Sequence, residues 1–143
     1  MSFDNKVAIV TGAGQGIGYE ICRMLSGKGA HVFLNDVDEA MAVGAAKKIT
    51  SETGGDCIGI AGDSSDIIFT RKMVGEAVSR FGHLDIVIAN AGITLFGDFF
   101  TYQPEAFSRV MQVNLSGTFF LAQAAANQMK QQSNGGSLLF TSS

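Results

Sequence analysis

The stretch Val7-Ala8-Ile9-Val10-Thr11-Gly12-Ala13-Gly14-Gln15-Gly16-Ile17-Gly18 decides the fold of this chain. A short apolar run rich in β-branched residues stops at a cluster of glycines, and a helical pattern begins there, which predicts strand, tight turn and helix. Glycine permits positive φ and lets a ligand approach the backbone closely. Because the helix directs its free N–H groups and its positive dipole end at the turn, we expect an anion site suited to a dinucleotide pyrophosphate.

The spacing of the glycines is specific. The common G-x-G-x-x-G turn of dinucleotide-binding proteins would need glycine at position 17 or 19, where this chain has Ile17 and Tyr19. The chain instead has threonine and glycine, three intervening residues, and then Gly16 and Gly18. A glycine-rich turn can also be a plain connection, so the rest of the chain must support the interpretation.

Apolar strands and helical segments alternate along the whole sequence. This order predicts right-handed βαβ units and an α/β fold with a doubly wound parallel sheet of Rossmann type. We expect one domain over residues 1–143, truncated after its fifth strand. In the first helix we expect Ile17, Ile21, Met24 and Leu25 to form the buried face. The expected strands are 7–11, 31–36, 57–61, 84–89 and 137–142, and the expected helices are 16–28, 39–52, 67–81 and 104–131.

Composition excludes several classes of function. The chain has 143 residues, 46% of them hydrophobic, and a net charge of −3 without a basic run, which argues against nucleic acid as a partner. We expect no membrane partner, because no apolar stretch approaches the length of a membrane span, and no signal-peptide pattern opens the chain. Cys22 and Cys57 lack metal or redox spacing and are expected to be buried free thiols. We therefore expect a cytoplasmic protein.

An acidic residue ends the second predicted strand and indicates which nucleotide would bind. Asp36 can accept hydrogen bonds from both hydroxyls of an adenosine ribose, and it would repel a 2′-phosphate. Gln15 is neutral at a position where a basic residue could pair with that phosphate. Both observations favour NAD over NADP. The alternative is that Asp36 is an ordinary carboxylate at the end of a strand.

Two further groups of residues follow predicted strands. Asp63 and Ser64 can hydrogen-bond the edge of an adenine, or they can belong to a cluster that only caps the next helix. Asn90, Ala91 and Gly92 follow the fourth strand, where small residues would let a cofactor lie against the backbone and the Asn90 side chain could tie neighbouring strands together.

Taken together, these motifs resemble the short-chain dehydrogenase/reductase family. Residues 11–18 look like its T-G-x-x-x-G-x-G turn, Asp63 like its adenine-contacting Asp, and residues 90–92 like its N-A-G motif. Val113-Asn114-Leu115 matches the segment with the family's catalytic Asn, and residues 135–143 resemble the strand that delivers its catalytic Ser, in a register that falls on Ser143. The resemblance covers the whole chain with every motif in order.

The resemblance implies a function and a set of site residues. A protein of this family would transfer hydride between NAD(H) and a small alcohol or carbonyl substrate, and would form a homo-oligomer, a dimer or a tetramer. Asn114 would bend its helix while its main chain holds a water of a proton relay, and Ser143 would hydrogen-bond the reacting substrate oxygen. No metal is implied. The implied cofactor contacts are Gly12, Gln15, Gly16, Ile17, Gly18, Asp36, Asp63, Ser64, Asn90, Ala91 and Gly92.

The sequence also departs from the family pattern. The family uses a tyrosine as general acid/base, with a lysine four residues later, beyond the catalytic serine; neither Tyr19 nor Tyr102 has lysine at that spacing. We therefore expect these 143 residues to hold the cofactor half of an active site and to be inactive alone. A non-catalytic NAD-binding module and a structural fragment remain alternatives. The phenylalanines of the segment 93–100 suggest either core packing or an apolar substrate wall.

Overall fold

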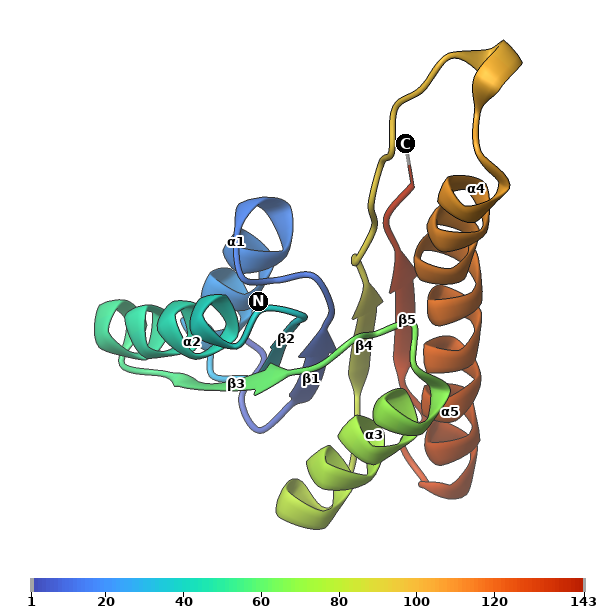
Figure 1. Ribbon diagram of the computed structural model, residues 1–143. Helices are drawn as coiled ribbons and strands as arrows, with labels where there is room; N and C mark the ends of the chain where they lie inside the picture. The colour runs from blue at the N-terminus through green and yellow to red at the C-terminus, as the bar shows by residue number, and fades with distance from the viewer. Residues whose placement is uncertain (1, 143) are drawn as a thin grey trace.

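A single parallel sheet organises the computed structural model, which describes residues 2–142. Its five strands lie in the order β3-β2-β1-β4-β5. This is the expected doubly wound arrangement, because the chain moves outward from β1 to β3 and then returns to place β4 on the other side of β1 (Figure 1). The strands are β1 (Val7–Val10), β2 (His31–Asp36), β3 (Asp56–Ala61), β4 (Ile86–Ala89) and β5 (Ser137–Phe140).

Helices cover both faces of the sheet (Figure 1). On one face lie α1 (Gly16–Ser26) and α2 (Glu39–Thr53), and on the other lie α3 (Ile67–Phe81) and α5 (Thr118–Gln131). Strand alternation divides the core accordingly: Ala8 and Val10 pack toward α1 and α2, whereas Val7 and Ile9 pack toward α3 and α5. All four of these β1 side chains are fully buried, which explains the nearly continuous apolar run in the sequence.

Local signals define most helix ends. Asp38 caps α2 by accepting a hydrogen bond from the Met41 N–H, and Asp66 caps α3. Gly54 and Gly82 end these two helices in the left-handed conformation. Apart from the long helix expected over 104–131, the expected strands and helices are confirmed, with differences of one or two residues at most of their ends.

The expected buried face of α1 is wrong at Ile17 and Met24 but confirmed at Leu25, and Ile21 is partly buried against the core. Ile17 and Met24 are 71% and 51% exposed, and the buried α1 residues are Gly18, Cys22, Leu25 and Ser26. The reason is close packing at the start of the helix: a Cβ on Gly18 would lie 2.7 Å from the Gly12 carbonyl oxygen and 2.8 Å from the Cα of Ala13, so α1 begins directly against the glycine turn. Gly18 and Cys22 therefore lie on the buried side, followed by Leu25 farther along the helix.

The long helix expected over 104–131 is interrupted. It consists of α4 (Pro104–Met111), a π-helical segment η2 (Gln112–Gly117) and α5, which follow one another directly. A π segment adds a residue to the turn and shifts the helix face that follows, and such segments are frequent at functional sites. The Asn114 side chain lies in this segment and bonds outside the helix.

The segment between β4 and α4 extends beyond the carboxyl end of β4 and turns back at the short helix η1 (Phe99–Thr101) (Figure 1). Core packing of its phenylalanines, one of the two expectations, is wrong within the described chain, because Phe96, Phe99 and Phe100 are 88–95% exposed. Phe99 and Phe100 contact each other edge to face instead. Leu84 and Asp85 were expected to open the fourth strand but precede β4. The backbone N–H and carbonyl of Leu84 bond to the Gln132 side chain instead of a strand, whereas the Asp85 backbone still bonds to Val7 and Ser137.

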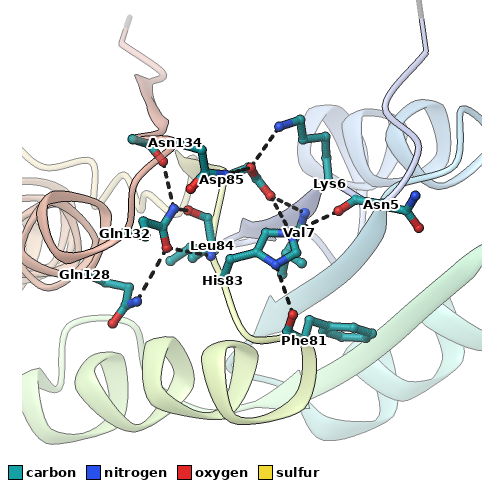
Figure 2. A network of polar contacts seen from close by, with 11 residues as sticks. Asn5, Lys6, Val7, Phe81, His83, Leu84, Asp85, Gln128, Gln132 and Asn134 are labelled. Carbon is teal, nitrogen blue, oxygen red and sulfur yellow. Dashed lines mark hydrogen bonds and ion pairs between the residues drawn. The ribbon is translucent and has the colours of Figure 1, made fainter.

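A polar network joins the amino ends of β1 and β4 with the turn before β5 (Figure 2). Asp85 is buried and accepts hydrogen bonds from the Lys6 Nζ at 3.0 Å, the Val7 N–H at 2.9 Å and the Asn134 Nδ2 at 3.0 Å. The Nε2 of His83 lies 3.1 Å from the same carboxylate. This network lies at the end of the sheet opposite the carboxyl ends of the strands, where ligands bind in such folds.

Other sequence expectations concern the thiols and the membrane. Cys22 and Cys57 are buried free thiols, as expected, and burial raises the pKa of Cys57 to about 12 and that of Cys22 further. Among residues 2–142, none of the helices combines the length and the apolar character that a membrane crossing requires.

Candidate functional site

The carboxyl ends of β1 and β4 border a cavity of about 410 Å³. The connections leave these two neighbouring strands toward opposite faces of the sheet, and this divergence opens a crevice where α/β folds bind ligands. Nine of the eleven predicted cofactor contacts line the cavity: Gly12, Gln15, Ile17, Asp36, Asp63, Ser64, Asn90, Ala91 and Gly92.

The glycines of the first turn meet different requirements. Gly12 has φ +60°, and a Cβ there would lie 2.7 Å from the Cα of Ala91. Gly16 has φ +61° but faces open space, and it lines an adjoining hollow with Gln15 rather than the main cavity. Gly18 is buried, with no room for a Cβ beside the Asn90 side chain. The glycine turn is therefore packed on the β4 side and open on the solvent side.

Asn90 ties the two diverging strands together, as the sequence suggested. Its Nδ2 donates to the carbonyl oxygens of Thr11 at 3.1 Å and Gly12 at 3.0 Å. The Thr11 hydroxyl in turn accepts hydrogen bonds from the backbone N–H groups of Asn90 and Ala91, both at 3.1 Å. These bonds fix the walls of the cavity.

Asp36 lies at the cavity wall and is held by backbone donors. One carboxylate oxygen accepts from the Gly14 N–H at 2.9 Å, and the other accepts from the Asp38 N–H at 3.1 Å. The side chain therefore has a fixed orientation next to the glycine turn, and each oxygen keeps capacity for another donor.

Asp63 does not cap α3, a task that falls to Asp66. Its Oδ1 accepts bonds from the Ser65 N–H at 2.8 Å and the Ser65 hydroxyl at 2.7 Å, and its Oδ2 accepts from Arg109 at 3.0 Å. Burial raises the pKa of Asp63, but the bonds from Ser65 and Arg109 outweigh that effect, so the pKa lies below the ordinary value of 3.8. The group is a fixed carboxylate at neutral pH.

A second cavity of about 520 Å³ shares Ile17, Asn90, Ala91 and Gly92 with the first and is also lined by Asn114 and Ser142. Asn114 is clamped to the start of the projecting segment: its Nδ2 donates to the Ile93 carbonyl at 2.9 Å, and its Oδ1 accepts from the Ile93 N–H at 2.8 Å. The other predicted catalytic residue, Ser143, lies outside the described residues.

The sequence analysis did not identify several residues of the main cavity. Asn35 is fully buried, and its Nδ2 donates to the carbonyls of Ile60 and Gly62, both at 3.0 Å. A polar residue near the end of an apolar strand was the available signal for it. Arg109 had no such signal, because its contact depends on how α4 docks. The residues concerned are Asn35, Val37, Ile93, Arg109 and Val113.

Neither tyrosine of the chain lies in these cavities. Tyr19 lies on α1 with its hydroxyl 3.5 Å from a Glu52 oxygen, and the Tyr102 hydroxyl donates to the Leu95 carbonyl. In the part of the chain that the structure describes, no group of three His, Cys, Asp or Glu side chains could hold a metal ion.

Comparisons with known proteins agree with the fold and the motifs. The family model described as short chain dehydrogenase matches residues 6–143. Versicolorin reductase 1 of Aspergillus parasiticus is 42% identical over 140 residues, which are 98% of this chain and 52% of that protein. An L-rhamnose 1-dehydrogenase (NAD(P)(+)) of Azotobacter vinelandii is 36% identical over 143 residues, which are 97% of this chain and 56% of that protein.

Solved structures give the same result. A short-chain type dehydrogenase/reductase from Mycobacterium marinum superposes with a TM-score of 0.94 at 30% identity, over 99% of this chain and 57% of that one. The chain therefore belongs to the short-chain dehydrogenase/reductase family, whose members are oxidoreductases that use NAD(P). It spans about half the length of the curated relatives it matches.

Proposed function

We propose that this chain forms the nucleotide half of an oxidoreductase that transfers hydride between NAD(H) and an alcohol or carbonyl substrate. One observation carries the proposal: the glycine turn and the Asp36 carboxylate, fixed by the Gly14 N–H, border one cavity at the point where the chain connections diverge. Relatives that are reductases and dehydrogenases support it.

The residues present fit a dinucleotide. The glycine turn is open to solvent at Gly16, where nothing lies within 4 Å of an added Cβ, so a pyrophosphate can approach the backbone and the start of α1. Asp36 would accept bonds from the adenosine ribose, and Asp63 from the adenine. Asn90, Ala91 and Gly92 border both cavities, so they would flank the nicotinamide portion.

Charge favours NAD over NADP in this proposal. Asp36 lines the cavity beside the uncharged Gln15 and Val37, and Arg109, a cation of the same lining, is paired with Asp63. A 2′-phosphate at the ribose would be repelled by Asp36, and Gln15 could not neutralise it.

Catalysis would involve the second cavity. Bound nicotinamide supplies or accepts the hydride. Asn114 would contribute its main chain to a proton relay, Ser143 would bond the substrate oxygen, and a small apolar or polar substrate would occupy the space beside them. Because neither tyrosine is placed for acid/base work, we expect these 143 residues alone to bind nucleotide without turnover. A cytoplasmic location and a homo-oligomer belong to the same proposal.

Calorimetric titration of the chain with NAD⁺ and NADP⁺ tests the proposed cofactor. We expect NAD⁺ to bind at least about tenfold more tightly, since a hydrogen bond to a charged group contributes that much affinity. Asp36→Asn should lower the affinity for NAD⁺ by a similar factor and reduce the difference in affinity between NAD⁺ and NADP⁺. Asp56→Asn removes the same charge at the opposite end of the neighbouring strand and should change neither affinity.

The outcomes separate the alternatives. Binding of NADP⁺ with equal or higher affinity in the native chain would contradict the NAD assignment. A folded chain that binds neither nucleotide would contradict the proposed function and leave the structural-fragment reading. Reduction of NAD⁺ by the chain with simple alcohols, followed at the NADH absorbance, would contradict the expectation that it is inactive alone.

A further inference from the structure

Arg109 crosses from α4 to the loop between β3 and α3. Its Nη2 donates to Asp63 Oδ2 at 3.0 Å, and its Nη1 donates to the Ser65 hydroxyl at 3.1 Å. That hydroxyl donates to Asp63 Oδ1 at 2.7 Å. The three side chains therefore form a closed ring of hydrogen bonds in which both carboxylate oxygens are held, and the carboxylate cannot rotate without breaking one of them.

This ring belongs to the nucleotide cavity. Asp63 and Arg109 both line it, together with residues of the glycine turn. Oδ2 accepts one bond within the described residues, the one from Arg109, and a carboxylate oxygen has room for a second donor. A ligand in the cavity could therefore add a hydrogen bond to Oδ2 without displacing Arg109.

Folding stability does not explain the ring. The side chains of Arg109 and Asp63 are 42% and 36% exposed, and ion pairs with such exposure contribute little to stability. The loop is also held by its backbone: a Cβ on Gly117 would lie 2.8 Å from the Ser64 carbonyl, so the helix and the loop already touch. Loss of the Arg109 side chain would therefore release Oδ2 of Asp63, while the bonds from Ser65 to Oδ1 and the position of the loop remain.

We propose that Arg109 is a positioning residue that orients Asp63 to accept a hydrogen bond from the exocyclic amino group of adenine. The inference rests on the proposed function, since it assumes an adenine nucleotide in the cavity. The oriented Asp63 carboxylate would make the chain selective for a base that has a hydrogen-bond donor where adenine has its exocyclic amino group. Hypoxanthine has a carbonyl there, and its oxygen would face the carboxylate without a proton between them.

The test compares NAD⁺ with nicotinamide hypoxanthine dinucleotide by calorimetry. We expect the native chain to prefer NAD⁺ by about tenfold or more. Arg109→Met keeps a long side chain but removes its hydrogen-bond donors. It should lower this preference to about twofold or less, mainly by lowering the affinity for NAD⁺. Arg109→Lys keeps the charge and one bond, and should retain an intermediate preference.

Two controls separate positioning from general damage. Arg23→Met removes an arginine of equal exposure that is paired with Glu20 on α1, away from the cavity, and should keep the native preference. Nicotinamide mononucleotide lacks the adenine, so its affinity should be the same in the native chain and in Arg109→Met.

The failures are distinguishable. Arg109→Met that retains the native preference for NAD⁺ would overturn the role of Arg109. Equal affinity of the native chain for the two dinucleotides would overturn it as well. In both cases the proposed function would stand. The inference would also be overturned if Arg109→Met bound both dinucleotides and the mononucleotide more weakly by the same factor, or lost its fold, and Arg109→Lys behaved no better. Arg109 would then be a structural residue. Failure of the native chain to bind either dinucleotide would overturn the proposed function together with it.

Discussion

Three glycines of this chain differ in what their positions require, so replacing each should change the stability differently. Gly12 combines positive φ with close contact to Ala91, Gly16 has positive φ in open space, and Gly44 lies inside α2 with open space and an ordinary backbone. Gly12 therefore needs glycine for space and for conformation, and Gly16 needs it for conformation alone. Gly44 needs it for neither.

Alanine substitutions at these glycines should therefore have graded effects. We expect Gly12→Ala to lower the free energy of unfolding by about 2–4 kcal/mol, through backbone strain and a clash at 2.7 Å with Ala91. Gly16→Ala should lower it by about 1–2 kcal/mol, and Gly44→Ala should raise it by about 0.5–1 kcal/mol. Urea unfolding of the three variants measures these differences. A Gly12 variant as stable as the Gly16 variant would contradict the close packing of the turn.

The lowered pKa of Asp63 predicts a contribution to the free energy of unfolding that is lost in acid. Its pKa in the folded chain lies below 3.8, so the folded state binds the proton less readily than the unfolded state. The contribution is present above pH 3.8 and is lost as pH falls through the folded pKa. We expect the stability of Asp63→Asn to fall less steeply below pH 4 than that of the native chain. Thermal unfolding between pH 6 and 3 measures the slopes, and parallel curves would contradict this prediction.

At the scale of elements, side-chain bonds fix how separate strands and helices meet. Gln132 follows α5 and accepts a hydrogen bond from the Leu84 N–H at 3.1 Å, while its Nε2 donates to the carbonyls of Leu84 and Gly135 (Figure 2). This side chain takes the place of strand pairing at Leu84, whereas the Asp85 backbone still bonds to Val7 and Ser137. Backbone pairing between the strands therefore begins at Asp85.

Removal of the central carboxylate of this network should destabilise the chain. We expect Asp85→Ala to lower the free energy of unfolding by about 2–4 kcal/mol, because the buried Val7 N–H loses its acceptor and Lys6 its partner. Lys6→Ala is the matched control: its side chain is 48% exposed, so its loss should cost less than about 1 kcal/mol. Urea unfolding compares the two, and equal losses would assign the effect to the ion pair alone.

For the whole molecule, the most prominent surface feature is an apolar face on α4, η2 and α5. Phe107, Met111, Leu115 and Phe119 recur every four residues and are 39–58% exposed beside a groove of about 650 Å³. An apolar face of this kind is typical of an interface. Since we propose a homo-oligomer, we expect two copies of the chain to meet there.

Sedimentation of charge variants tests this interface. Phe119→Glu should weaken self-association at least tenfold, because a charge would be buried among apolar side chains. Phe96→Glu places the same charge on the projecting segment, where the native side chain is 95% exposed, and should leave association unchanged. A native chain that stays monomeric, or equal weakening by both variants, would contradict an interface on this face.

The parallel sheet and most of the predicted residues at its carboxyl edge follow from local signals in the sequence. Apolar runs, glycine turns and capping residues are local signals, so the alternation of strands and helices could be read directly, and residues that end parallel strands must meet at one edge. Nine of the eleven predicted cofactor contacts line one cavity for this reason. Their role as cofactor contacts stays a prediction.

The choice of buried helix face and the distant side chains of the site follow from packing. The buried face of α1 depends on how closely Gly18 approaches the glycine turn, which the helical period of the sequence does not encode. The bonds of Asn114 to Ile93, 21 residues earlier, and of Arg109 to Asp63, 46 residues earlier, depend on how their helix docks. Contacts of this range arise from packing, because no local signal at Arg109 or Asp63 specifies the partner.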